Sequence, residues 1–357
     1  STASWAKTAH LPYLLASHKY TINGVCNSTL ASSAEAIKTH SLTSTATPYA
    51  CPTDLAASSD IDLVVCAVRV DRHYECLKPV LEAGRDCFVE WPLASNLSQA
   101  QELLALAEVK GVRTMVGLQG RMSPVIHRLK DLIEKKGVLG NVLSSSLDLA
   151  GMVGGRATVE WAEYLEDAET GGNMLTIPVG HLYDSISIVV GELQSLAATV
   201  STQTKIVDVS PGDGVKGGTP KKIQRTAVDH VSFSGLLSSG AQSSVVVYGG
   251  EPFPGEPHLI WRIEGEKGVL DVRAKHTFAI NMSVGDIKVR LQDFASGEVK
   301  EIEIQDDQPG PVGNVGRLYE AFADGEKVPD WKDAVMRHSW VDAVERSSRI
   351  YSDGLRW

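Results

Sequence analysis

The sequence predicts an α/β fold in which an N-terminal Rossmann domain, a doubly wound parallel sheet, precedes a C-terminal α/β domain with an open, mostly antiparallel sheet. Two observations lead to this prediction. Apolar runs and helical segments alternate regularly through about the first third of the chain, as in a parallel sheet covered by helices. After about residue 145, strand-like segments follow one another with few helices between them, and several alternate apolar and polar residues.

The elements of the first domain follow from its apolar runs. The nearly continuous apolar run IDLVVCAVRV is typical of a parallel strand buried on both faces. Two helical segments end at Gly84 and Gly111, where glycine favours the turn that closes a helix. The predicted helices cover residues 3–18, 32–40, 71–84 and 97–111, and the predicted strands cover 20–27, 61–70, 86–92 and 113–120.

The second domain is predicted mainly from alternating segments. Its strand-like segments are residues 142–151, 195–205, 227–237, 242–251, 258–274 and 278–286. Residues 205–222, rich in glycine and proline, are predicted as a mobile loop, and residues 314–325 and 330–354 return to helix. We therefore predict a dinucleotide-binding domain over residues 1–122 and a substrate and oligomerisation domain over 123–357, with the C-terminal helices packing back on the first domain.

Composition narrows the class of protein. The 357 residues are 43% hydrophobic and 22% charged, which suits a globular chain of two domains. The formal charge of -10 and the lack of a dense Lys/Arg run argue against direct binding of nucleic acid. No apolar run reaches the roughly 18 residues of a membrane span, and no secretory signal is visible. Five cysteines without a C-x-x-C pair favour a cytoplasmic, metal-free protein.

One strand is missing from the expected order. A doubly wound nucleotide-binding domain normally opens with a strand and a glycine-rich turn such as G-x-G-x-x-G, whereas this sequence opens at the first helix. We expect that the sequence is shortened at its N-terminus and that STAS ends the phosphate-binding turn. Ser1, Ser4 and Trp5 are then cofactor contacts, because N–H groups at a helix N-terminus bind pyrophosphate. Simple capping of the helix by Ser4 is the alternative.

The ends of the predicted strands supply the other candidates for cofactor contacts, because ligands of open α/β sheets bind at the carboxyl ends of strands. His73 is one of them, and its alternative role is to cap the helix that it begins. The set consists of Asn27, Ser28, Val68, Val70, His73, Glu90, Trp91, Pro92 and Gln119.

The choice between NAD and NADP rests on the end of the second strand of the fold. NAD-specific domains carry an acid there that bonds the ribose hydroxyls. The sequence reads Asn27-Ser28-Thr29, with neither an acid to repel a 2′-phosphate nor an arginine to attract one. Both cofactors fit this pattern, and the missing acid favours NADP slightly.

Six segments in a shared order resemble the glucose-fructose oxidoreductase/inositol dehydrogenase/MocA family over nearly the whole chain. The segments EWPLASNLSQA, GLQGRMSP and GHLYD look most like the branch that holds the galactose-regulon repressor of yeasts. The six are WAKTAHLPYLL (5–15), VRVDRHYE (68–75), FVEWPLA (88–94), VGLQGRMSPVIHRLKDLI (116–133), GGNMLTIPVGHLYD (171–184) and WRIEGEKGVLDV (261–272).

This resemblance implies NAD or NADP in the crevice at the strand ends, and hydride transfer to or from a sugar, a polyol or a related substrate. The sequence also departs from the family's motifs in two places. Trp91 stands where the family's enzymes have a lysine that helps to move the proton, and an indole has no proton to exchange. In the second motif, the family's aspartate falls at Ile177 and its glycine at Val179, whereas His181 and Asp184 remain.

The resemblance places the catalytic candidates on the second motif. His181 is the expected general acid or base, acting alone or with Tyr183 or Tyr164, and Asp184 is a third candidate. Trp91, Arg121, Trp161, Tyr164 and His181 are the expected substrate contacts. The alternatives are that Trp91 and Trp161 only fill space, that His181 is a satisfied buried histidine, that Arg121 pairs with a carboxylate, and that Asp184 only supports its neighbours.

Three functions remain open at this point. The chain is predicted to be an NAD(P)-dependent oxidoreductase with an atypical site; the alternative is a regulator that binds a dinucleotide and a protein partner without turnover. A third possibility is non-redox chemistry assisted by His181. A homodimer through the open sheet of the second domain is expected, because that face would otherwise leave apolar surface exposed.

Overall fold

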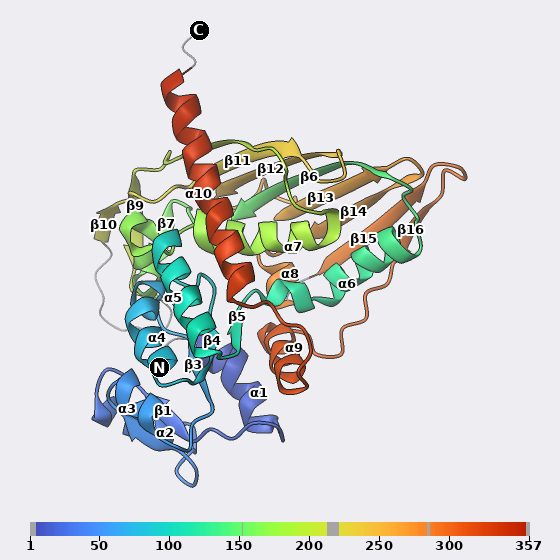
Figure 1. Ribbon diagram of the computed structural model, residues 1–357. Coiled ribbons are helices and arrows are strands. Elements are labelled where there is room, and N and C mark those ends of the chain that lie inside the picture. The colour runs from blue at the N-terminus through green and yellow to red at the C-terminus, as the bar shows by residue number, and fades with distance from the viewer. Residues whose placement is uncertain (1–4, 152, 213–220, 284–285, 355–357) are drawn as a thin grey trace. The chain divides into compact units, whose positions relative to one another are not determined.

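The computed structural model describes residues 5–151, 153–212, 221–283 and 286–354, which fold as two compact units (Figure 1). Unit 1 comprises Ser1–Gln119 and Gly310–His338, and unit 2 comprises Gly120–Pro309 and Ser339–Trp357. The boundary after Gln119 lies close to the predicted boundary after residue 122. The C-terminal segment 310–338 belongs to unit 1, so the first unit is built from two separate stretches of the chain.

Unit 1 alternates short strands and helices, and every strand pair in it is parallel. The two-stranded sheet pairs β1 with β2, and the three-stranded sheet has the order β3-β4-β5. The elements are η1 (Ala6–His10), α1 (Leu11–Ala16), β1 (Gly24–Cys26), α2 (Leu30–Thr39), β2 (Thr47–Tyr49), α3 (Pro52–Ala57), β3 (Leu63–Cys66), η2 (Val70–Arg72), α4 (His73–Glu82), β4 (Asp86–Val89), α5 (Leu97–Lys110), β5 (Thr114–Val116), α9 (Pro311–Ala323) and the start of α10 (Trp331–Gly354).

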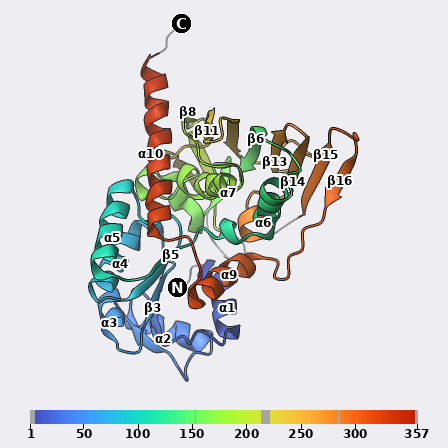
Figure 2. The same ribbon diagram turned by 45° about the vertical axis from the view of Figure 1, so that its right-hand side comes forward.

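Helices cover both faces of the β3–β5 sheet, with α4 and α5 on one side and α1 and α9 on the other (Figures 1 and 2). This burial explains why β4 reads as an unbroken apolar run, since Cys87, Phe88 and Val89 are all fully buried. Local signals set the helix ends. The Asn96 side chain caps α5 by accepting from the backbone N–H of Gln99, and Gly111 closes it with φ 64°.

Unit 2 is built on an eight-stranded sheet of order β16-β15-β14-β13-β6-β12-β11-β8, in which only the β12–β6 pair is parallel. Its elements are η3 (Gln119–Met122), α6 (Pro124–Lys130), η4 (Asp131–Lys135), β6 (Val142–Gly151), β7 (Ala157–Val159), η5 (Glu160–Glu166), η6 (Ala168–Thr170), η7 (Leu175–Val179), α7 (Gly180–Val190), β8 (Ala197–Ser201), β9 (Ile206–Ser210), β10 (Lys221–Gln224), β11 (His230–Leu236), β12 (Gln242–Gly249), β13 (Leu259–Gly265), β14 (Gly268–Ala274), α8 (Ala279–Met282), β15 (Ile287–Asp293), β16 (Val299–Ile302) and the end of α10.

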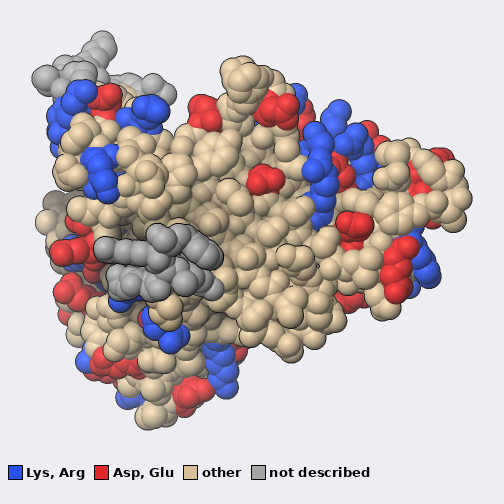
Figure 3. Space-filling model, turned by 90° about the horizontal axis from the view of Figure 1, so that it is seen from above, with Lys and Arg blue, Asp and Glu red and all other residues tan. Residues whose placement is uncertain are grey.

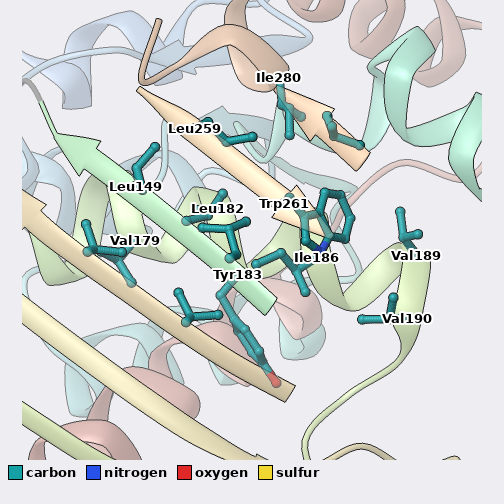
Figure 4. Packing of buried hydrophobic residues seen from close by; sticks show 14 of the residues in the cluster. Leu149, Val179, Leu182, Tyr183, Ile186, Val189, Val190, Leu259, Trp261 and Ile280 are labelled. Atoms are coloured by element: carbon teal, nitrogen blue, oxygen red, sulfur yellow. The ribbon is translucent and has the colours of Figure 1, made fainter. Parts of the chain in front are cut away.

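One face of this sheet carries the core of unit 2. Helices α6 and α7 lie against that face (Figure 1), and side chains from α7 interdigitate with those of β6 and β13 (Figure 4). The fully buried Trp261 keeps its polar atom satisfied, because its indole N–H donates to Ser145 Oγ at 2.9 Å. The alternation of buried and exposed residues along β13 and β14 follows from this one-sided burial.

A smaller sheet, of order β10-β9-β7, is held by a buried arginine. The guanidinium of Arg225 is fully buried and donates to Glu166 Oε2 at 2.6 Å and to Asp229 Oδ2 at 3.1 Å. It also donates to the backbone carbonyls of Gly154, Gly155 and Thr204. One cation thus satisfies two buried carboxylates and three carbonyls from four separate segments.

The structure corrects several predictions of secondary structure. Residues 279–282 of the predicted strand 278–286 form helix α8, and residues 284–285 lie outside the described residues. The predicted loop 205–222 begins and ends in the paired strands β9 and β10, while residues 213–220 lie outside the described residues. The sequence patterns also missed β2, α3, β15 and β16, which are short or lack a continuous apolar run.

Replacing Arg225 by methionine is expected to lower the free energy of unfolding by about 3–5 kcal/mol, because two buried carboxylates would lose their cation. Arg262→Met is the matched control: its guanidinium is half exposed and bonds Asp271 on the sheet surface, so the change should be within about 1 kcal/mol. Chemical denaturation of both variants measures the difference. Equal losses in the two variants would contradict this assignment.

Candidate functional site

A pocket of unit 1 with a volume of about 640 Å³ lies between β1 and β3. Among the described residues β1 pairs only with β2 and β3 only with β4, so both strands turn an open edge to this cavity. Two open parallel edges suit an extended chain, whereas a dinucleotide is expected at the carboxyl ends of the strands.

At that carboxyl edge, a chain of three side chains ends at the partly buried Glu90, which directly follows β4. His10 of η1 lies with Nδ1 2.8 Å from the hydroxyl of Tyr319 and with Nε2 2.7 Å from Glu90 Oε1. Tyr319 comes from α9 and is fully buried, and His10 is buried as well. Burial raises the pKa of Tyr319 well above its ordinary value, so its hydroxyl keeps the proton.

Trp91 packs inside unit 1. Its indole is 4% exposed, belongs to the apolar cluster of the parallel sheet and lies 4.8 Å, ring centre to ring centre, from His338 of α10. Burial, with a smaller contribution from His73, lowers the pKa of His338 to about 4. The Trp91–Pro92 peptide bond is cis. This geometry favours the packing role for Trp91 over a stacking contact with a ligand.

His73 is held by backbone carbonyls on both sides. Its Nδ1 lies 2.9 Å from the carbonyl oxygen of Pro92 and its Nε2 lies 3.0 Å from that of Val68. Burial lowers the pKa of His73, and a neutral imidazole donates to one of these carbonyls at a time. His73 therefore ties the segment after β3 to the segment after β4, and it also begins α4.

The remaining predicted cofactor contacts lie in differing surroundings. Gln119 is buried, and its Oε1 accepts no hydrogen bond from the residues that the structure describes. Val68 is exposed and Val70 is buried in η2. Asn27 donates from its side chain to the carbonyl of Ser32, Ser28 is exposed, and Trp5 precedes η1. Ser1 and Ser4 lie outside the described residues.

In unit 2, the three predicted catalytic residues lie on α7, and Arg121 of η3 pairs with one of them. Arg121 donates from Nε and Nη2 to both carboxylate oxygens of Asp184, at 2.9 and 2.7 Å. This bidentate pair is nearly buried, and it favours a supporting role for both residues. Gly120 makes the close approach possible, because a Cβ there would lie 2.3 Å from Ser185 Oγ. His181, one turn before Asp184, is also buried.

Tyr183 belongs to the core instead of this group. Its ring stacks on Trp340 at 4.1 Å between ring centres, and its hydroxyl donates to Glu192 Oε2 at 3.0 Å while accepting from the backbone N–H of Leu193. Residues two apart on a helix face away from one another, which separates Tyr183 from His181. The geometry favours a structural role for Tyr183.

The two other predicted substrate contacts lie on η5 of unit 2. The side chain of Trp161 is 70% exposed. Tyr164 is half-buried, and its backbone carbonyl accepts from the hydroxyl of Thr170. The exposed indole of Trp161 is available to a ligand or a partner.

Sequence reasoning missed His10, Tyr319 and His338. His10 and Tyr319 are 309 positions apart, so no local pattern joins them. The only available signal was that His10 lies in WAKTAHLPYLL, one of the segments that carry the family resemblance. His338 lies in a predicted helix, and only the tertiary structure brings it to Trp91.

The polar groups of unit 1 fit a dinucleotide better than a metal ion. Among the described residues, no group of three His, Cys, Asp or Glu side chains converges as metal ligands. No helix in the described part of the chain is long and apolar enough to span a membrane. Glu90, at the end of β4, instead has a partly exposed carboxylate, an acceptor that matches the hydroxyl and amide donors of a dinucleotide.

Comparisons with known proteins agree with this geometry. A sequence model described as the oxidoreductase family with an NAD-binding Rossmann fold matches residues 3–118, and a model of the C-terminal domain of Gal80p matches residues 124–274. Together these two matches span most of both units and confirm the resemblance that the sequence motifs predicted.

Relatives over most of the chain include both regulators and dehydrogenases. The galactose/lactose metabolism regulatory protein GAL80 of Saccharomyces cerevisiae is 29% identical, over 98% of this chain and 90% of that protein. The dehydrogenase aclE of Aspergillus oryzae is 31% identical, over 82% of this chain and 78% of that protein. The structure of a super-repressor mutant of Gal80p from Saccharomyces cerevisiae superposes with a TM-score of 0.87 at 26% identity, covering 97% of this chain and 94% of that one.

His338→Phe is expected to remove a pH-dependent part of the stability. The pKa of His338 in the folded chain, about 4, lies below the value near 6.5 of an unfolded histidine, so the unfolded state binds more protons between these pH values. As the pH falls from 6.5 to 4, the free energy of unfolding of the wild type should therefore fall by about 3 kcal/mol more than that of the variant. Urea unfolding across this range measures it, with exposed His18→Phe as the control. Parallel pH profiles for wild type and His338→Phe would contradict this account.

Proposed function

Because the chain belongs to the glucose-fructose oxidoreductase/inositol dehydrogenase/MocA family, we propose that it binds a nicotinamide dinucleotide and oxidises or reduces a sugar, a polyol or another small hydroxy or carbonyl compound. The observation that carries this proposal is the carboxyl edge of the parallel sheet, where the partly exposed carboxylate of Glu90 offers an acceptor to a ligand. The relative dehydrogenase aclE covers most of the chain and supports the redox assignment.

The proposed reaction needs one hydride and one proton to move. A bound nicotinamide supplies or accepts the hydride. The imidazole of His181 takes the hydroxyl proton in oxidation and returns it in reduction, because its ordinary pKa lies near neutrality. Arg121 and Asp184 support the helix turn that carries His181 through their bidentate pair. Trp91 takes no part in proton transfer, because an indole cannot exchange its proton at neutral pH.

A regulator that binds a dinucleotide without turnover is the second candidate. Two observations favour it: the family's lysine is replaced by the buried Trp91, and the relatives over 98% of the chain include GAL80 regulatory proteins. Under this proposal the ligand-bound chain acts through a protein partner, and the exposed Trp161 is available for such a contact.

We propose both NAD and NADP as cofactors, with a slight preference for NADP. Asn27 uses its side-chain amide to bond the carbonyl of Ser32, and the side chain of Thr29 caps α2. Ser28 is therefore the nearest exposed side chain at the end of β1, and a hydroxyl tolerates a 2′-phosphate where a carboxylate would repel it. We retain a cytoplasmic location as part of this proposal.

The outer face of the eight-stranded sheet supports a homodimer. Figure 3 views this face and shows a broad area without charged side chains. Uncharged side chains line its β11 and β12 strands, where Ser232, Ser234 and Ser244 lie around Val246, which is 45% exposed. Depletion of charged side chains is typical of the core of an interface.

A single-turnover experiment tests the enzymatic proposal. The wild type is loaded in turn with NAD(H) and NADP(H), a panel of sugars, polyols and carbonyl compounds is added, and the nicotinamide absorbance is followed. We expect a substrate-dependent change that His181→Ala slows about 10²–10⁴-fold, the usual contribution of a general acid or base. The exposed His18→Ala should leave the rate unchanged.

Cofactor binding without an absorbance change across the whole panel would reject the oxidoreductase proposal and favour the regulator. An unchanged rate in His181→Ala would reject the assigned role of this histidine while leaving the redox activity in place.

Sedimentation equilibrium tests the homodimer. The wild type is expected to sediment as a dimer, and Val246→Glu should raise the dimer dissociation constant at least about tenfold, because it would bury a carboxylate in the interface. Val299→Glu, on the exposed edge strand β16, is the matched control and should have little effect. A monomeric wild type at working concentration would exclude the proposed interface.

A further inference from the structure

The two carboxylate oxygens of Glu90 have different surroundings. Oε1 lies 2.7 Å from His10 Nε2, whereas Oε2 accepts no hydrogen bond from the residues that the structure describes. The side chain is 12% exposed, so this second oxygen is neither sealed in the core nor freely solvated. A carboxylate accepts and cannot donate, so a ligand at this oxygen must bring an N–H or an O–H group.

The carboxylate fixes the donor at the Glu90 end of this chain. Because a carboxylate accepts and cannot donate, the Nε2 of His10 that faces Glu90 carries a hydrogen and donates it. The other ring nitrogen, Nδ1, lies 2.8 Å from the hydroxyl of Tyr319. Three segments distant in the sequence thus meet in one hydrogen-bonded chain.

The carboxyl group of Glu90 also packs closely against Gly117. This glycine follows β5, and a Cβ at its position would lie 2.8–2.9 Å from Oε1, Oε2 and Cδ of Glu90. The carboxyl group therefore lies directly over a residue that has no side chain, between the ends of β4 and β5. An alanine at this position would displace it.

We propose that Tyr319 and His10 are positioning residues that hold Glu90 so that its Oε2 accepts a hydrogen bond from the nicotinamide half of the bound dinucleotide. The donor is the carboxamide N–H or a hydroxyl of the adjoining ribose. Glu90 follows β4, in the β3–β5 sheet, and in a doubly wound fold each half of the sheet binds one mononucleotide, with the adenosine on the β1 side. This inference rests on the proposed binding of a dinucleotide.

The test compares the affinities of NAD⁺, ADP-ribose and ADP for the full chain by calorimetry, with the 2′-phosphorylated counterparts if these bind more tightly. In Glu90→Gln the amide oxygen still accepts from His10, while an NH₂ group replaces Oε2. We expect about 10–100-fold weaker binding of NAD⁺ and an unchanged affinity for ADP, because ADP lacks the nicotinamide half. If the donor is the ribose hydroxyl, the affinity for ADP-ribose should fall as that for NAD⁺ does. If the donor is the carboxamide, the affinity for ADP-ribose should stay unchanged, like that for ADP.

Gly117→Ala tests the same position without changing the carboxylate, and it should produce the same selective loss. Tyr319→Phe and His10→Gln should weaken the binding of NAD⁺ by a smaller factor, about 3–10-fold, and leave the binding of ADP unchanged. Tyr20→Phe is the matched control. Its ring packs on Tyr319 and its hydroxyl donates to the Tyr319 backbone carbonyl at 2.8 Å, so it lies outside the hydrogen-bonded chain to Glu90. The ratio of the affinities for NAD⁺ and ADP in this variant should therefore equal the wild-type ratio.

Structural damage would lower the affinities for NAD⁺ and ADP together, and that outcome in Glu90→Gln and Gly117→Ala overturns the positioning role. An unchanged affinity for NAD⁺ in both variants overturns it as well. A wild type that binds none of the three nucleotides or their 2′-phosphorylated counterparts overturns the proposed dinucleotide binding, and this inference with it. The two failures are distinguishable because one is seen in the wild type and the other only in the variants.

Discussion

The parallel pairing of β3, β4 and β5 is the constraint on which the candidate site of unit 1 depends. Parallel neighbours must be joined by crossovers, here α4 and α5, and their carboxyl ends must then meet at one edge. This is why Glu90 after β4 and Gly117 after β5 are adjacent although they are far apart in the sequence. The hydrogen-bonded chain from Tyr319 through His10 to Glu90 adds α9 and η1 to the same edge.

In unit 2, helix α7 determines where the predicted catalytic side chains lie. Its sheet is buried on one face only, so a single helix, α7, can carry core residues on one side and polar residues on the other. Tyr183 faces the core, whereas Asp184 is committed to Arg121 through both carboxylate oxygens. Since Asp184 is already paired with a cation, the proposed proton transfer is assigned to His181.

Trp91 separates the two functional proposals. A lysine at this position has an ammonium that burial can tune for proton transfer, whereas the indole is enclosed with the neutral His338 in an apolar cluster. The fold of the family is retained, whereas Trp91 stands at the position of the family's lysine. An enzyme of this kind must rely on His181, and a regulator needs only the binding edge.

The sequence by itself determined the fold class, because the periodicity of apolar residues is a local property that each strand and helix carries. It also placed Glu90 and Gln119 at strand ends, where this fold binds ligands. It could not find β2 or α3, which are too short to show a pattern, and it assigned residues 279–282 to a strand, whereas they form α8. Only the tertiary structure decided that His10 and Tyr319 meet Glu90, that His338 covers Trp91 and that Arg121 pairs with Asp184. These partners come from distant segments, and packing geometry selects them through distances that no local pattern contains.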